Sequence, residues 1–155
     1  TQYLTYGQPG FLRAPLTNNG FQNYQEWIAF HGIREDASAP EASAAGDDVT
    51  NLFRYVARLS PFADASTAFS RPHLYRDPET GEDHLAISTR TRPLPEGTTL
   101  LIEQSFSLSF EGNPAVEVGA PITHNDQTIS RIFRTSQPVT ASSRQFLRVR
   151  VTSSE

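Results

Sequence analysis

The first apolar pattern in this chain has a helical period. Large apolar and aromatic residues recur at intervals of three and four residues within 24–31, which places them on one helix face. Asn23 before this run is a favoured N-cap, with Glu26 as its reciprocal capping partner, and Gly32 just after the run is a typical C-terminal stop. The sequence therefore predicts a short helix over 24–31. The recurring residues are Tyr24, Trp27, Ile28 and His31.

The same face pattern returns later in the stretch AGDDVTNLFRYVARLSP, residues 45–61. A polar loop rich in Ala and Ser, without periodicity, separates it from the first helix. Pro61 cannot continue a helix, so it sets the latest possible end. The sequence predicts a second helix over 49–59. Its apolar face is formed by Leu52, Tyr55, Val56 and Leu59.

From Phe69 onward the pattern changes to short apolar and β-branched runs separated by Gly, Pro, Asn and Asp, which is typical of an all-β fold. The clearest alternation is QFLRVRV at 145–151, which predicts one apolar face and one face that carries Arg. We expect an antiparallel β-sandwich of immunoglobulin-like type, with a hairpin turn at 77–83. The predicted strands are 72–76, 83–92, 98–104, 106–110, 115–118, 128–134 and 145–151.

Residues 1–22 fit neither period. Their Pro and Gly residues and an Asn-Asn-Gly turn signal predict an extended N-terminal arm. In an extended segment Leu4 and Tyr6 share one side and Tyr3 takes the other, while Phe11 follows a Gln-Pro-Gly bend. We predict that Tyr3, Leu4, Tyr6 and Phe11 bind a partner by strand addition. Packing of the arm on its own domain is the open alternative. The predicted regions are the arm 1–22, a helical part 23–68 and a β-sandwich 69–155, with 23–155 as a single domain.

Composition narrows the chemistry. Cys is 0, which excludes thiol catalysis, zinc–thiolate sites and iron–sulfur ligation from these 155 residues. The chain starts at Thr1 and has no Met, which indicates a processed or truncated product. It contains no run of 18 apolar residues, so we predict no membrane insertion. All 13 basic residues are Arg and they are spread along a chain of net charge −4, so the field does not favour nucleic acid. Protein or glycan partners fit better.

Three blocks in a fixed order resemble a known family. They are YQEWIAFHGI, then GDDVTNLFRYVARLSP, which is similar to an Asp-Pro-Asp-Gly-Asp-Gly-x-x-Asn-Leu-x-Glu-Tyr-Ala segment, and the terminal SRQFLRVRVT. HLAISTRTR and LLIEQSFSLSF between them resemble a strand pair of the same family. The chain thus resembles, from about residue 23 to 152, the C-terminal domain of large secreted proteins of Verrucomicrobia and related bacteria. The resemblance implies a secreted β-sandwich appendage with a calcium-type loop, and no activity.

The loop is degenerate as a calcium site. Calcium requires six to eight oxygen ligands, which such a loop supplies through alternating carboxylates. The corresponding positions here are Ser43, Ala45 and Asp47, of which only the last is a carboxylate. Arg54 stands where the family has Glu and is expected to add a repelling charge. We therefore predict no metal or other cofactor, with Asp47 or Asp48 acting as the cap of the second helix.

Other candidate residues have weaker signals. Trp27 on an apolar helix face is expected in the core rather than on a sugar platform. Tyr75 is the better glycan candidate, because it lies beside His73 and Arg76 on a probable edge strand. The Arg residues of 90–92 and 148–150 are expected on a solvated sheet face, paired with acidic side chains, and a cross-strand arginine ladder is the alternative arrangement. The acidic candidates for that pairing are Glu103, Glu111 and Glu117.

No motif in the chain indicates catalysis. The four His residues, His31, His73, His84 and His124, lack the spacing of metal ligands, and the turn at 123–126 is ordinary turn chemistry. We predict a non-catalytic extracellular structural or interaction module, which assembles with copies of itself or another surface protein through the arm, as in a filament or surface layer. The alternatives are a carbohydrate-binding module of a secreted polysaccharide-degrading enzyme and a C-terminal sorting or anchoring domain.

Overall fold

The computed structural model describes residues 21–107, 109–142 and 144–154. Two short helices come first, α1 (Tyr24–Phe30) and α2 (Asn51–Val56), with short 3-10 turns η1 (Glu35–Ala37) and η2 (Ala65–Thr67). The partner-binding residues predicted in the arm, Tyr3, Leu4, Tyr6 and Phe11, lie outside the described residues. The strands are β1 (His73–Arg76), β2 (Asp83–Thr91), β3 (Thr98–Ser105), β4 (Val116–Glu117), β5 (Ile122–Thr123), β6 (Ile129–Arg134) and β7 (Phe146–Ser153).

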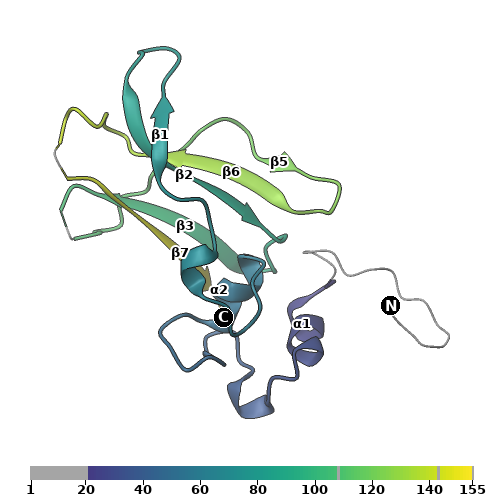
Figure 1. The fold of residues 1–155 in the computed structure, drawn as a ribbon. Coiled ribbons are helices and arrows are strands. Elements are labelled where there is room, and N and C mark those ends of the chain that lie inside the picture. Colours follow the sequence, from purple (N-terminus) through teal and green to yellow (C-terminus); the bar gives the residue numbers. More distant parts are fainter. Residues whose placement is uncertain (1–20, 108, 143, 155) are drawn as a thin grey trace.

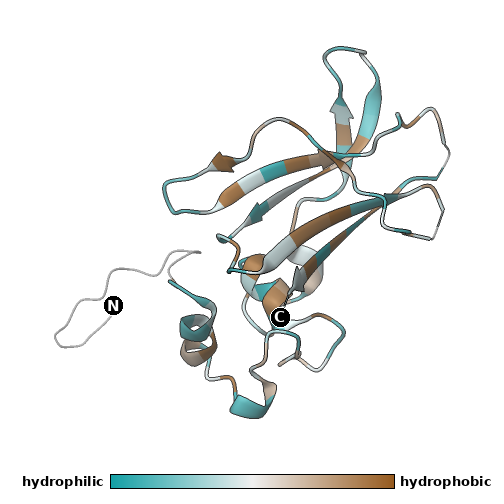
Figure 2. Ribbon diagram, turned by 180° about the vertical axis from the view of Figure 1, so that it is seen from behind, coloured by the Kyte–Doolittle hydropathy of each residue, from teal (hydrophilic) through white to brown (hydrophobic). Residues whose placement is uncertain are grey.

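All strand pairs are antiparallel and they form two sheets (Figure 1). One sheet has the order β1-β2-β6-β4, with β5 also paired to β6, and the other consists of β3 and β7. Ile87 of β2 and Phe133 of β6 pack with Ile102 of β3 in one buried cluster, which joins the two sheets. Figure 2 shows apolar stretches on strands of both sheets. The predicted fold, mainly antiparallel strands in a sandwich-like arrangement with two short helices, is confirmed.

A second core lies at the helical end of the molecule. Trp27 is 0% exposed and packs with Tyr55 and Val56, and its indole N–H donates to the Leu59 carbonyl over 3.2 Å. Val151 of β7 packs against this cluster, so the helices lie against the end of the two-stranded sheet (Figure 1). Burial of each large side chain contributes about 1.5–3 kcal/mol. The prediction that Trp27 is a core residue is confirmed.

Helix α1 begins where the sequence predicts. Asn23 Oδ1 accepts the Glu26 N–H over 2.8 Å, and Gly32 follows the helix with φ +64, a conformation that costs glycine nothing. The capping box differs in one detail, because Glu26 Oε1 accepts from the N–H of Gln22 rather than from that of Asn23. Local signals alone therefore place this helix.

Helix α2 is shorter than the predicted 49–59, and its cap is different. Thr50 Oγ1 accepts the Phe53 N–H over 3.1 Å, so neither Asp47 nor Asp48 is the N-cap. At the other end the Arg58 N–H donates to Tyr55 and the backbone turns left-handed at Arg58, with φ +68. The helix thus stops at Val56, ahead of Pro61, by a terminating turn that usually contains glycine.

The strands agree with the prediction to within a few residues, with two exceptions. The described residues of 106–110 form no strand, because Ser105 Oγ lies within hydrogen-bond distance of the Ser107 and Ser109 carbonyls and curls the chain after β3. Strand β5 was not predicted, since two residues are too short for an alternation signal. At the other strands the predicted elements are present.

The alternative of a cross-strand arginine ladder is wrong. Strand β2, which carries Arg90, and strand β7, which carries Arg148 and Arg150, belong to different sheets. The predicted pairing with Glu103 is confirmed for β7, because Arg148 and Arg150 both reach this carboxylate on β3, at 2.6 and 3.6 Å. The alternation of β7 is as expected, because Leu147 and Val149 pack into the core between the sheets. Sequence alternation gave the face of each side chain but not the neighbouring strand.

Candidate functional site

The loop that resembles a calcium turn is built around an arginine. Arg54 of α2 is 1% exposed and its Nη1 and Nη2 atoms contact the two carboxylate oxygens of Asp47, at 3.1 and 2.6 Å. Its Nη1 also donates to the Val49 carbonyl over 2.8 Å and its Nε to the Ala63 carbonyl over 3.0 Å. The guanidinium thus supplies the positive charge of this loop. Arg54 thus brings its positive charge against the one carboxylate of the three ligand positions.

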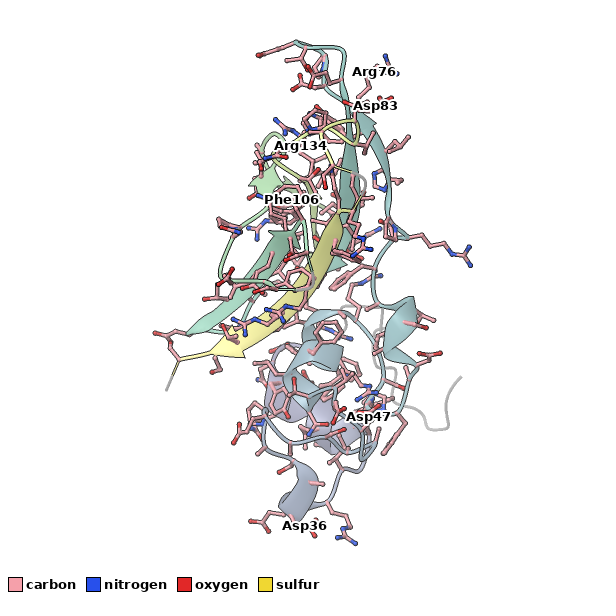
Figure 3. The ribbon with its side chains drawn as sticks, turned by 90° about the vertical axis from the view of Figure 1, so that its left-hand side faces the viewer. Asp36, Asp47, Arg76, Asp83, Phe106 and Arg134 are labelled. Carbon is pink, nitrogen blue, oxygen red and sulfur yellow. The ribbon has the colours of Figure 1, made fainter. Side chains whose placement is uncertain are left out.

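Further hydrogen bonds fix the same loop. Asp47 accepts from the hydroxyl of Ser43 over 2.9 Å and from the Val49 N–H over 3.0 Å. The hydrogen bond from Arg54, followed by the Val49 and Ser43 bonds, holds the pKa of Asp47 well below its ordinary value. Figure 3 shows Asp47 at the helical end, far from the sheet hairpin.

Asn51 secures the loop from inside. It is fully buried, its amide nitrogen donates to the carbonyls of Ala37 and Ala39, and its amide oxygen accepts the Ala44 N–H. Within the described part of the chain, no group of three His, Cys, Asp or Glu side chains could hold a metal ion. The loop is a hydrogen-bonded frame whose cation is a side chain.

The open edge of the larger sheet is strand β1. It pairs only with β2 among the described residues, and its Leu74 is 62% exposed. The register continues past the strand, where the Asp77 N–H donates to the Glu82 carbonyl. Because hydrogen-bonded pairs alternate in an antiparallel ladder, the backbone groups of Leu74 and Arg76 point away from β2. Relative to the part of the chain that the structure describes, this edge presents an unpaired row of donors and acceptors.

Tyr75 lies on this edge strand, as the sequence predicts. Together with Asp77, Val116 of β4 and Arg134 of β6 it lines an open cavity of about 240 Å³. Arg134 donates to the Thr135 carbonyl over 2.9 Å and lies 3.7 Å from the Asp77 carboxylate. Aromatic and charged side chains from three strands therefore meet at one end of the sheet face.

The other members of the predicted Tyr75 group are only partly brought together. His73 shares the face of Tyr75, because the two alternate along β1. Arg76 lies on the opposite face, where it pairs with Asp83 over 2.9 Å beside the hairpin (Figure 3). The structure thus supports Tyr75 with Arg134, and not with Arg76.

Three of the histidines contact non-metal partners. His84 is buried, with Nδ1 2.9 Å from the Thr135 carbonyl oxygen, and His124 Nε2 lies 2.7 Å from Ser130 Oγ. His31 packs against aromatic rings, including that of Trp27, and burial lowers its pKa. These contacts give each side chain a structural role.

A second cavity, which sequence reasoning missed, lies beside the end of α2. It has a volume of about 390 Å³ and is lined by Arg58, Arg90 and Arg131, with Ser and Thr hydroxyls between them. The one sequence signal was an arginine at the position after a helix where glycine is usual. The other lining residues come from three segments that are distant in sequence, so no local motif exists.

No helix among the described residues has the length and apolar character that crossing a membrane requires. Comparison of the chain with protein-family models, with curated proteins and with solved structures gave no match.

Proposed function

We propose that this chain is a non-catalytic extracellular interaction module, in which the N-terminal arm of one copy adds as a strand to the β1 edge of another. Such head-to-tail addition links identical subunits into an open chain, because donor and acceptor surfaces differ. The extracellular setting follows the sequence resemblance to secreted proteins. The observation that carries the proposal is the backbone edge at Leu74 and Arg76, which no strand of the described residues covers.

The β1 edge has the chemistry that strand addition uses. An incoming extended segment gains main-chain hydrogen bonds from the outward groups of Leu74 and Arg76, and selectivity from side chains. Leu74 stands opposite the half-buried Leu85, which offers an apolar strip to the apolar side of the arm, Leu4 and Tyr6. Burying each of these two arm side chains contributes about 1.5–3 kcal/mol before ordering costs.

The opposite edge of the same sheet is a poorer acceptor. There β4 and β5 are two residues each and both pair with β6, so the edge is broken into two short pieces. Short edge strands are one way in which proteins avoid pairing with other chains. This edge nevertheless exposes Ile122, 61% exposed, which makes it a matched control for Leu74.

The test is size-exclusion chromatography with light scattering on four proteins: the intact chain, a deletion of residues 1–12, Leu74→Lys and Ile122→Lys. We expect assembly of the intact chain and of Ile122→Lys, and monomers for the deletion and Leu74→Lys, all with similar far-UV circular dichroism. A lysine on an edge strand opposes pairing by its charge. A monomeric intact chain, or equal effects of the two lysines, contradicts the proposal.

The cavity at Tyr75 favours a second candidate, a carbohydrate-binding module. A half-buried aromatic ring can stack on a sugar ring, and Asp77 and Arg134 beside it can hydrogen-bond the sugar hydroxyls. A glycan array with the intact chain and with Tyr75→Ala separates the two functions. If the intact chain binds a glycan, Tyr75→Ala abolishes that binding and deletion of residues 1–12 does not change assembly, the carbohydrate-binding function is favoured.

A further inference from the structure

The groove beside α2 is formed on the outer face of the larger sheet. Ser88 of β2 pairs with Ile132 of β6, and Arg90 pairs with Ser130. Since side chains alternate along a strand, these four residues share the face turned away from the core between the sheets. Residues 68–70 run beside Ser88, with which they exchange two hydrogen bonds, and form a wall. The result is a concave floor of hydroxyl and apolar groups.

Arg58 reaches this groove from a strained backbone. Its φ of +68 lies in the left-handed region, which is unfavourable for a residue with a Cβ and is usual for glycine after a helix. Backbone strain of this kind collects at functional sites, where the side chain repays it. An arginine is kept where glycine is the conformationally easier residue, so its side chain is the feature to explain.

The guanidinium of Arg58 is incompletely satisfied. Its Nε is shut off from solvent without a hydrogen-bond partner, and the opposite charge that acts on it is that of Asp126. Burial and the nearby Arg90 lower its pKa while Asp126 raises it, and burial is the largest of the three effects, which marks an unfavourable setting for a cation. Buried donors are normally satisfied, so a missing acceptor points to one that comes from outside the chain.

The charges around the groove leave a single positive charge. Arg90 pairs with Asp126 over 3.2 Å and its Nε donates to Thr128, and Asp126 also acts on Arg58. Arg131 and its partner Glu117 alternate onto the face of Phe133, so they are outside this count. Arg58 and Arg90 with one carboxylate therefore leave one net positive charge at the groove. One extra positive charge matches a singly charged anion better than a phosphate monoester, which carries about −1.5 to −2.

We propose that this groove binds the anionic group of an acidic saccharide, a uronate carboxylate or a sulfate ester, through Arg58. A guanidinium fork recognises such planar or multi-oxygen anions with two hydrogen bonds. The hydroxyls of Ser88 and Ser130 are suited to sugar hydroxyls, and Ile132 on the floor offers an apolar surface. A volume of about 390 Å³ is in the range of small-molecule sites.

The test is isothermal titration calorimetry of the intact chain with four probes: trigalacturonate, a singly sulfated galactose disaccharide, maltotriose and sodium sulfate. We expect at least one acidic saccharide to bind about tenfold or more tightly than maltotriose and sodium sulfate, as expected for a hydrogen-bonded charge pair. Binding of the uronate alone or of the sulfated sugar alone identifies the source of the anion.

Variants at the same position assign the site. Arg58→Gly relieves the left-handed strain, so we expect an unchanged or higher melting temperature together with at least about a tenfold loss of affinity for the acidic saccharide. Arg58→Gln keeps the strain and removes the charge, and should lose affinity equally. Arg34→Ala removes one exposed charge at the other end of the molecule and should leave binding intact.

Three results overturn the proposal. The first is an affinity of Arg58→Gly equal to that of the intact chain. The second is an equal loss in Arg34→Ala, which means that net charge alone attracts the saccharide. The third is binding of maltotriose or sodium sulfate as tight as that of both acidic sugars.

Discussion

The two arginines that flank the end of α2 have opposite settings. Arg54 is almost fully buried, and its three guanidinium nitrogens all donate, to Asp47, Val49 and Ala63. Arg58, one helical turn later, has a buried Nε without a partner and a left-handed backbone. Arg54 is thus a fully hydrogen-bonded structural cation, whereas Arg58 on the same segment has a buried nitrogen without a hydrogen bond.

The difference separates folding from binding. A buried charge is tolerable when hydrogen bonds and a counterion replace its water, which is the case for Arg54. At Arg58 the fold leaves Nε without a hydrogen bond, shares the one carboxylate of Asp126 between Arg58 and Arg90, and adds backbone strain, so this residue works against stability. The variants below test the contrast, since they should shift stability in opposite directions.

The largest expected effect is that of Arg54→Ala. It removes the charge-assisted bonds to Asp47 and leaves two loop carbonyls without their donor, which should cost about 3 kcal/mol of unfolding free energy. For a chain of this size the melting temperature should fall by roughly 10 °C. Thermal denaturation followed by circular dichroism measures it, with Arg34→Ala as the exposed control. A loss no larger than that of the control removes Arg54 from its structural role.

The ion pair between Asp47 and Arg54 should also make the stability depend on pH in the acid range. The folded pKa of Asp47 is depressed, so its contribution to stability is complete above the unfolded value of about 4 and is lost as pH falls toward the folded pKa. Asp126 behaves alike, since the hydrogen bonds from Thr128 lower its pKa to about 2. The unfolding free energy, measured by urea denaturation between pH 6 and pH 2, should fall less steeply with falling pH in Asp47→Asn than in Asp48→Asn. Parallel curves for the two variants contradict this assignment.

A smaller effect tests the cap of α2. Thr50→Ala removes the side chain that accepts the Phe53 N–H, and should lower stability by about 1 kcal/mol. Asp48→Ala, the alternative cap in the sequence interpretation, should leave it nearly unchanged. Chemical denaturation of the two variants decides between them, and a larger loss for Asp48→Ala would return the cap to the aspartate.

The smallest effect has the opposite sign. Arg58→Gly should raise the unfolding free energy by up to about 1 kcal/mol, because glycine adopts the left-handed conformation without a Cβ clash. Differential scanning calorimetry on Arg58→Gly and on Arg58→Ala isolates the backbone term, since alanine removes the same charge but keeps the strain. If the two variants have equal melting temperatures, the backbone at Arg58 is not strained.

Helix α1 and the approximate positions of the strands were predictable because their sequence signals are local. Asn23 and Gly32 bracket α1 through bonds within a few residues. Helix α2 was less predictable, because Asp47 had two possible partners and bonds to Arg54 rather than to the helix N-terminus. Which partner the Asp47 carboxylate takes depends on the conformation of the loop, which buries the Arg54 guanidinium beside it.

Sheet membership and the groove depended on long-range pairing. The alternation of β7 correctly predicted which side chains face the core, yet its neighbour proved to be β3 rather than β2. Tyr75 could be placed on an edge from its flanking turns, whereas Arg58 meets Arg90 only after α2 packs beside the larger sheet. Residues that come together from distant segments show no characteristic spacing in the sequence, so no motif predicts them.

The central claim is that the β1 edge accepts the arm of another copy. Hydrogen–deuterium exchange of the backbone amides of Leu74 and Arg76 tests it most directly, because these two N–H groups point away from β2. The account predicts slow exchange that becomes slower as protein concentration rises, and fast exchange at all concentrations after deletion of residues 1–12. Fast exchange in both proteins at every concentration contradicts it.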